Sequence, residues 1–157
     1  MLYFKLLGME INLNCDLGEK SKHHSNENDP ELLKIVNSAN VACGYHAGDE
    51  QTMQEIVKIS KENNVSIGAH PSFKDPENFG RKRMDLSASE ITKLVTDQYE
   101  ILQNIASLQG EKVSHIKPHG ALNNMACEDL ELATTLAKTI YHICLLYTSP
   151  SPRDTRE

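Results

Sequence analysis

The sequence contains few cysteines, and none of them lies in a metal-binding or redox motif. The four are Cys15, Cys43, Cys127 and Cys144, and no C-x-x-C pair occurs. A zinc ribbon and a thioredoxin-type redox centre are therefore not indicated, and a disulfide scaffold does not fit so low a cysteine density in 157 residues. We expect buried free thiols and a cytoplasmic protein.

Long apolar runs and basic segments are also missing. The apolar stretch at residues 2–7 is interrupted by Lys5 and is followed by no small-residue cleavage site, so neither a signal peptide nor a membrane span is expected. The 22 acidic and 16 basic side chains give a formal net charge of -6 without a basic stripe. This balance speaks against a nucleic-acid partner, because phosphate recognition requires clustered lysine and arginine.

What the sequence does contain is a regular alternation of strand-like and helical segments. Four β-prone apolar runs are separated by segments with apolar residues at helical spacing. Asp29 followed by Pro30, and Ser87 with Glu90 in the spacing of a capping box, are helix start signals. The expected strands are 9–14, 35–43, 65–70 and 113–118, and the expected longer helices are 49–62, 87–108 and 129–143. This order predicts an α/β fold with parallel strands.

Two common nucleotide-binding motifs are absent from this alternation. There is neither a G-x-G-x-x-G after the first strand nor a G-x-x-x-x-G-K-[ST]. A Rossmann site or a P-loop is therefore not supported, and a (β/α) TIM-like barrel, or part of one, is the remaining interpretation. About four βα units fit into residues 9–143, so we expect this segment to be the N-terminal part of a single barrel domain.

Polar side chains lie at or just after the carboxyl end of each expected strand. They are Asn14, Asp16 and Glu19 for the first strand, His46 and Asp49 for the second, His70 for the third, and Lys117 and His119 for the fourth. Because the carboxyl ends of parallel strands meet on one face, we expect these side chains to share a pocket. The long connection 71–86 adds Arg81, which either steers an anionic substrate or is a solvated loop residue. Asp49 also fits a plain helix N-cap.

The expected pocket permits two kinds of chemistry. Asp16, His46 and His70 together suit a divalent metal site, with water completing the coordination shell. Without a metal, the histidines can transfer protons near neutral pH, and Lys117 can hold a carboxylate or a developing oxyanion. His115 is expected to point away from the pocket, since side chains alternate along a strand.

These strand ends resemble the signatures of the LamB/YcsF family, described as the A subunit of the bacterial 5-oxoprolinase. The matching segments are INLNCDLGE (11–19), SANVACGYHAGD (38–49), IGAHPSF (67–73), FGRKRM (79–84) and HIKPHGALNNMA (115–126). Two departures occur: KSKHHSNEND follows Glu19 where the family has small and glycine residues, and Asn123 stands where the family has a tyrosine.

The resemblance implies a barrel of the glycoside hydrolase/deacetylase type. It implies ATP-dependent opening of the lactam 5-oxo-L-proline (pyroglutamate) to L-glutamate, with two partner subunits, B and C. The absence of a P-loop is consistent with ATP being handled through these partners. The residues that match the family motifs are Asp16, His46, His70, Lys117 and His119 as the catalytic set, with Asn14, Glu19 and Asp49 close by as substrate-binding residues. A metal-dependent polysaccharide or N-acetyl deacetylase, and a lactam- or carbohydrate-binding protein without turnover, are the alternatives.

The two ends of the chain differ from the rest. Residues 1–8 precede a second candidate start, Met9, and we expect them to be a non-native extension. Residues 144–157 do not continue the preceding helical pattern and resemble a translated sequencing adapter, the alternative being a genuine disordered Ser/Pro tail. A complete barrel has ~250 residues, so we expect the native sequence to continue differently after Ile143.

Overall fold

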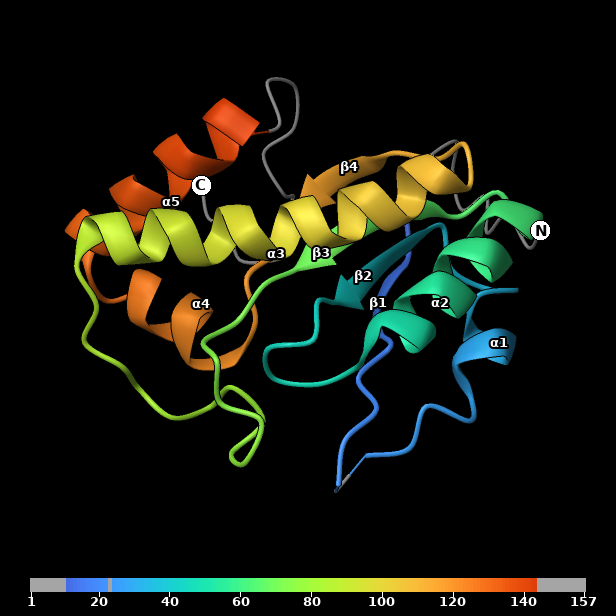
Figure 1. Cartoon of the computed structure of the whole chain (residues 1–157), viewed down its shortest axis with the longest axis horizontal. Helices are drawn as coiled ribbons and strands as arrows, with labels where there is room; N and C mark the ends of the chain where they lie inside the picture. Colours follow the sequence, from blue (N-terminus) through green and yellow to red (C-terminus); the bar gives the residue numbers. More distant parts are fainter. Residues whose placement is uncertain (1–10, 23, 144–157) are drawn as a thin grey trace.

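The computed structural model describes residues 11–22 and 24–143 (Figure 1). The elements in chain order are β1 (Asn14–Leu17), α1 (Asp29–Leu32), β2 (Ser38–Ala42), α2 (Glu50–Glu62), β3 (Ser66–His70), α3 (Ala88–Leu108), β4 (Val113–Ile116), α4 (Gly120–Ala126) and α5 (Leu130–Ile143). The predictions for residues 1–8 and 144–157 lie outside the described residues.

The strands form a parallel sheet in the order β1-β2-β3-β4. β1 pairs with β2 from Asn14 opposite Ser38, and β2 pairs with β3 as far as Ala42 opposite His70. The pairing of β3 with β4 contains one irregularity next to Gly68. Consecutive parallel neighbours joined by helices are the βα units of a barrel, so the predicted α/β class is confirmed and the arrangement is compatible with a TIM-like barrel. All four strands end at the same edge of the sheet.

The two longer helices that follow β2 and β3 begin where the sequence signals place them. Asp49 is the N-cap of α2, and its side chain accepts the backbone N–H of Thr52 at 2.7 Å. Ser87 and Glu90 form the complete capping box at the start of α3. These caps satisfy backbone donors that have no partner inside the helix.

The expected cap of α1 is wrong. Asn28 occupies the N-cap position, and Asp29 lies inside the first turn with a buried side chain. Oδ2 of Asp29 accepts the backbone N–H of Gly18 at 2.7 Å. The aspartate is therefore used to hold the turn after β1, which leads directly to Glu19, rather than to cap its own helix.

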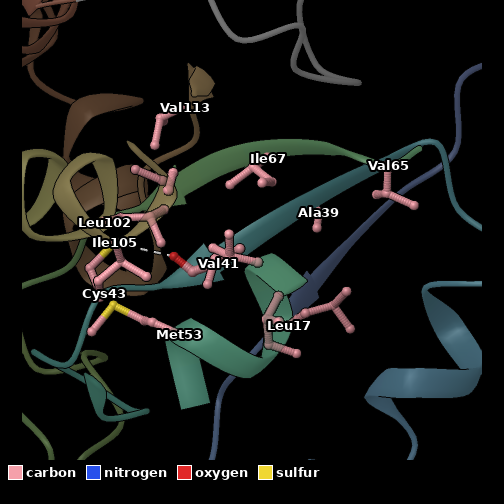
Figure 2. Close-up of a cluster of buried hydrophobic side chains, with 14 of the residues drawn as sticks. Leu17, Ala39, Val41, Cys43, Met53, Val65, Ile67, Leu102, Ile105 and Val113 are labelled. Atoms are coloured by element: carbon pink, nitrogen blue, oxygen red, sulfur yellow. Dashed lines mark hydrogen bonds between the residues drawn. The ribbon is translucent and has the colours of Figure 1, made fainter. Parts of the chain in front are cut away.

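One face of the sheet packs against α2 and α3 and forms the main core (Figure 2). Alternate residues of β1, β2 and β3 point to this face, as the period of two requires, whereas the irregularity in β4 places Val113 and Ile116 there. The buried cluster contains Leu17, Ala39, Val41, Ile67, Ala69, Val113 and Ile116 from the strands, Cys43 just after β2, and Met53, Ile56, Val57, Leu102, Ile105 and Ala106 from the helices. Burial of apolar surface contributes roughly 25 cal/mol per Å², so this face supplies much of the stability of the fold.

A smaller core lies beneath the connection 71–86. Phe73 is fully buried there and belongs to one cluster with Ile91 of α3, Leu122 of α4 and Leu136 of α5. α5 also packs against both α3 and α4. This second core anchors the connection 71–86 close to the ends of β3 and β4.

Several local expectations need correction. Within the described part of the expected strand 9–14, residues 11–13 are not in a strand, and β1 runs from Asn14 to Leu17, so Asp16 lies within the strand instead of after it. The sequence pattern does not predict α4, which has only seven residues. Cys43 is buried as expected, whereas Cys127 is exposed. Among the helices of the described chain, none combines the length and hydropathy that crossing a bilayer requires.

Candidate functional site

The second face of the sheet carries hydrogen-bonded polar side chains. Asn40 of β2 donates its two amide hydrogens to Oδ1 of Asn14 and to Oδ1 of Asp16, each at 2.9 Å. Its own Oδ1 lies 2.9 Å from Nε2 of His115, which donates to it. Asn40 is only 1% exposed, so this buried amide is paired on every side. The network ties β1, β2 and β4 together across the polar face.

At the carboxyl edge of the sheet, four side chains converge on one point: Glu19, His46, His70 and His119. Oε1 of Glu19 lies 3.1 Å from Nε2 of His46, 3.7 Å from Nε2 of His70 and 3.3 Å from Nδ1 of His119. Nε2 of His70 and Nδ1 of His119 are 3.0 Å apart. The rings of His46 and His119 stack with their centroids 4.0 Å apart. All three histidines are buried, so the cluster is shielded from bulk water.

Backbone carbonyls orient two of these imidazoles. Nδ1 of His70 donates to the carbonyl oxygen of Lys117, and Nε2 of His119 donates to the carbonyl oxygen of Phe79 at 2.9 Å. A carbonyl oxygen can only accept, so the proton of each neutral ring lies on the nitrogen that faces the backbone. The other nitrogens, Nε2 of His70 and Nδ1 of His119, therefore direct lone pairs toward the centre of the cluster.

Asp16 forms an ion pair with Lys117 beside this cluster. Nζ of Lys117 lies 2.6 and 2.9 Å from the two carboxylate oxygens, and Oδ2 of Asp16 is 3.4 Å from Nε2 of His70. Burial opposes ionisation of Asp16, but its polar contacts with His70 and with the Lys117 ammonium outweigh burial and hold the pKa of this carboxyl well below its usual range. Asp16 is therefore an anion at neutral pH, and its side chain is still 34% exposed to an incoming ligand.

Burial and close packing disfavour the charged forms of His46 and His119. Burial, together with repulsion from His46 and His70, lowers the pKa of His119 to about 4. Burial also lowers the pKa of His46, against the opposing effect of its hydrogen bond to Glu19. His119 is therefore neutral at pH 7, and its Nδ1 can accept a proton or bind a cation.

The connection 71–86 presses directly against the histidines. Phe79 has a φ of 56°, and its ring meets His46 and His119 edge-on with centroid distances of 5.4 and 5.2 Å. Gly80 follows with a φ of 66°, and a Cβ at this position would lie 2.0 Å from Oγ of Ser72. Such a backbone conformation persists only where the surrounding structure holds it. Here it aims the carbonyl of Phe79 at His119.

Three of the expected substrate-binding residues lie outside the histidine cluster. The side chain of Asp49 bonds to Thr52 and acts as the helix cap that its position also allows. The guanidinium of Arg81 lies over the ring of Phe79, 5.4 Å from its centroid, so one aromatic ring separates it from the histidines. Asn14 is connected to the site through Asn40.

Two residues of the polar face, Asn40 and His115, are not among the expected site residues. A polar residue in the otherwise small and apolar strand SANVA is the signal that identifies Asn40. The expectation for His115 is wrong, because the register shift between β3 and β4 pairs Val113 with Ile67 but His115 with Gly68, which places His115 on the polar face although Val113 faces the core. Gly68 makes room for this ring, since a Cβ at Gly68 would lie 2.1 Å from Nε2 of His115.

The residues that can hold a metal ion differ from the expected set. Donor atoms within 4.8 Å of one another belong to Glu19, His46, His70 and His119. The carboxylate of Asp16 is instead engaged by Lys117 and Asn40. A set of three imidazoles and one carboxylate is compatible with a divalent cation.

Relatives of known family match most of this chain. The family model described as the LamB/YcsF family matches residues 11–153. Proteins named as the A subunit of 5-oxoprolinase, from Bacillus mycoides (strain KBAB4) and Staphylococcus carnosus (strain TM300), are 50% identical over 133 residues and 44% identical over 135 residues. These matches cover 85% and 86% of this chain but 52% and 54% of the two relatives, so the chain spans about half their length.

A solved structure agrees with the family match. The crystal structure of a lactam utilization protein from Thermus thermophilus resembles this chain with a TM-score of 0.81 and 38% identity, over 86% of this chain and 55% of that one. Sequence and fold therefore agree, and the chain belongs to the LamB/YcsF family.

Proposed function

We propose that this chain is part of the A subunit of an ATP-dependent 5-oxoprolinase, which opens the lactam of 5-oxo-L-proline to give L-glutamate. The observation that carries the proposal is the ion pair of Lys117 and Asp16, placed next to the buried histidines at the carboxyl edge of the sheet. The names of the relatives and of the Thermus protein support a lactam as the substrate class.

The substrate offers a carboxylate and a cyclic amide, and the site has a group suited to each. Lys117 is the cation that binds the substrate carboxylate or the lactam oxygen as charge develops there. Asp16 is the candidate general base for water, since its low pKa leaves it unprotonated at neutral pH.

The reaction adds water to the lactam carbonyl carbon and breaks the bond between that carbon and the ring nitrogen. The oxygen of water becomes part of the new side-chain carboxylate, and the nitrogen takes a proton and becomes the amino group of glutamate. An unstrained amide is a poor electrophile, so the proposal couples ring opening to conversion of ATP to ADP and phosphate. The B and C subunits handle the nucleotide.

The proposal also extends to the domain organisation of the protein and to its location in the cell. We propose that residues 9–143 are the N-terminal half of one barrel, because the chain spans about half of each relative and its described sheet has four strands. We also propose a cytoplasmic location, for which the free thiols of Cys15 and Cys43 are the support.

The test uses a hybrid protein, because the chain spans about half of its relatives. Residues 11–143 replace the matching half of the Bacillus mycoides relative, and the hybrid is mixed with the B and C subunits of that organism. We expect glutamate and ADP to form from 5-oxoproline and ATP. Asp16→Asn should lower turnover at least 100-fold, whereas the control Asp97→Asn, in the exposed ion pair with Lys93 on α3, should leave turnover unchanged.

The proposal fails if the folded hybrid releases no glutamate while the intact relative does so in the same mixture. A second candidate, a metal-dependent deacetylase, is favoured by the group of Glu19 and three histidines. It predicts acetate release from an N-acetyl sugar without ATP. Binding of 5-oxoproline in calorimetry, with no turnover, would instead identify a binding protein.

A further inference from the structure

In the cluster of Glu19, His46, His70 and His119, lone pairs face each other with no proton between them, which is electrostatically unfavourable. The nitrogens of His70 and His119 that face each other are 3.0 Å apart. The backbone carbonyls of Lys117 and Phe79 accept from the opposite nitrogen of each ring. In the neutral rings, two lone pairs therefore point at each other, and the carboxylate of Glu19 adds a third electron-rich group.

We infer that this cluster is a binding site for one divalent cation of the zinc type. The atoms that face the centre are Oε1 of Glu19, Nε2 of His46, Nε2 of His70 and Nδ1 of His119. Each of these residues offers a donor atom within 4.8 Å of those of the other three. The set shares His46 and His70 with the site expected from the sequence, but Glu19 and His119 take the place of Asp16.

The spacing of these atoms fits a small tetrahedral ion. Zinc bonds of about 2.0–2.1 Å in tetrahedral geometry separate neighbouring ligand atoms by about 3.3 Å. The separations are 3.1, 3.7 and 3.3 Å from Glu19 to the three histidines, and 3.0 Å between His70 and His119. These four separations lie on both sides of the expected spacing, and ion binding requires the stacked rings of His46 and His119 to tilt toward a common point.

The hydrogen bonds around the cluster have the pattern that metal-bound histidines usually show. A ligating histidine commonly donates its other N–H to a backbone carbonyl or a carboxylate, which fixes the tautomer and the ring orientation. His70 and His119 both do so. Nδ1 of His46 is buried and has no hydrogen-bond partner among the described residues. Only the contacts of Nε2 can therefore decide which nitrogen of this ring carries the proton.

The donor set selects the class of ion. Three imidazoles and one carboxylate favour Zn²⁺ and similar late first-row ions, whereas Mg²⁺ and Ca²⁺ prefer sites made of oxygen ligands. When bound, such an ion acts as a Lewis acid toward a neighbouring carbonyl oxygen. Asp16 and Lys117 stand beside this position, where a substrate that reaches His70 would also meet them.

The inference goes beyond the proposed lactam reaction, and its test uses neither substrate nor ATP, so each can fail without the other. The 157-residue chain is treated with a chelator, dialysed and titrated with ZnCl₂ in a calorimeter at about pH 7.5. We expect one equivalent of Zn²⁺ to bind, and MgCl₂ to bind at least roughly 100-fold more weakly. Substitution with Co²⁺ should produce the visible absorption of a tetrahedral ion.

Variants distinguish this site from adventitious binding to exposed histidines. His119→Ala removes a ligand and should weaken Zn²⁺ binding by more than the roughly 10- to 100-fold that loss of a hydrogen-bond partner of a ligand typically causes. His142→Ala removes an exposed imidazole from α5 and is the matched control, with no change expected. Glu19→Gln preserves side-chain volume and gives a second test if His119→Ala does not fold, as judged by circular dichroism.

Two results would overturn the inference. The first is a folded wild-type chain that binds no stoichiometric Zn²⁺ or Co²⁺. The second is Zn²⁺ binding that survives undiminished in folded His119→Ala and Glu19→Gln, which would place the ion away from this cluster; its loss in His142→Ala would then identify the exposed histidine as the ligand.

Discussion

The two faces of the parallel sheet are made by alternate residues of the same four strands, yet they have different roles. The face toward α2 and α3 is continuous and apolar, and its side chains contribute through packing (Figure 2). On the other face, Asn40, Asp16, His115 and Lys117 each depend on a specific hydrogen bond. Stability and chemistry are therefore separated in this molecule by the two-residue period of a strand.

The apolar face should give the largest loss of stability when a side chain is removed. Leu102 of α3 is fully buried against the sheet, and Leu102→Ala should lower the free energy of unfolding by about 2–5 kcal/mol. Leu108→Ala, in the same helix at a position 87% exposed, should change it by less than about 0.5 kcal/mol. Urea unfolding of both variants checks the contrast, and equal losses would show that the apolar face is not the main core.

The polar face should be sensitive to added volume at Gly68. A Cβ at this position would lie 2.1 Å from Nε2 of His115, so Gly68→Ala must displace the ring and should cost about 1–3 kcal/mol. The double variant with His115→Ala should recover part of this loss, because the clash is then absent. A double-mutant cycle from thermal unfolding measures the coupling, and simple additivity would contradict the packing seen here.

Loss of the amide of Asn40 should have an effect of similar or smaller size. Asn40→Ala leaves Asp16 Oδ1 and the Nε2–H of His115 without one partner each, which should cost about 1–3 kcal/mol. Asn104→Ala, on the exposed face of α3, is the control and should be nearly neutral. If chemical denaturation shows no difference between the two variants, the network does not contribute to stability.

The smallest predicted effect is a pH dependence that comes from His115. Burial, together with the electrostatic effects of the neighbouring His70 and Lys117, lowers the pKa of His115 below its value in the unfolded chain. The unfolded state then binds the proton first, so the contribution is complete above about pH 6.5 and is lost as the pH falls through the folded pKa. His115→Gln should flatten the fall in stability between about pH 7 and 5. An unchanged slope would mean that His115 titrates normally.

The sheet and its longer helices could be predicted from sequence because their signals are local. Apolar β-prone runs mark β2, β3 and β4, and the caps at Asp49 and Ser87 mark α2 and α3. Parallel topology also predicts that polar strand ends meet at one edge. The prediction places β1 too early, because the apolar residues of the segment 9–14 outweigh the polar residues Asn14 and Asp16, which face the polar side of the sheet.

The partner of each polar side chain could not be predicted in the same way. Glu19 and His46 are 27 residues apart, and nothing in their spacing indicates that their atoms lie 3.1 Å from each other. The exclusion of Asp16 from the donor group depends on Lys117, which is 101 residues away in the chain and reaches it with a long flexible side chain. These contacts depend on how the loop 71–86 and the strand ends pack together in three dimensions.

The strand ends orient lone pairs toward one buried point, and the tautomer of His119 tests this central claim most directly. Long-range ¹H–¹⁵N NMR of the chain at neutral pH reports which ring nitrogen carries the proton. We predict the Nε2–H tautomer, held by the carbonyl of Phe79, with an unprotonated Nδ1 whose resonance shifts when Zn²⁺ is added. An Nδ1–H tautomer that does not respond to Zn²⁺ would contradict the claim, because the lone pair would then point away from Glu19 and His70.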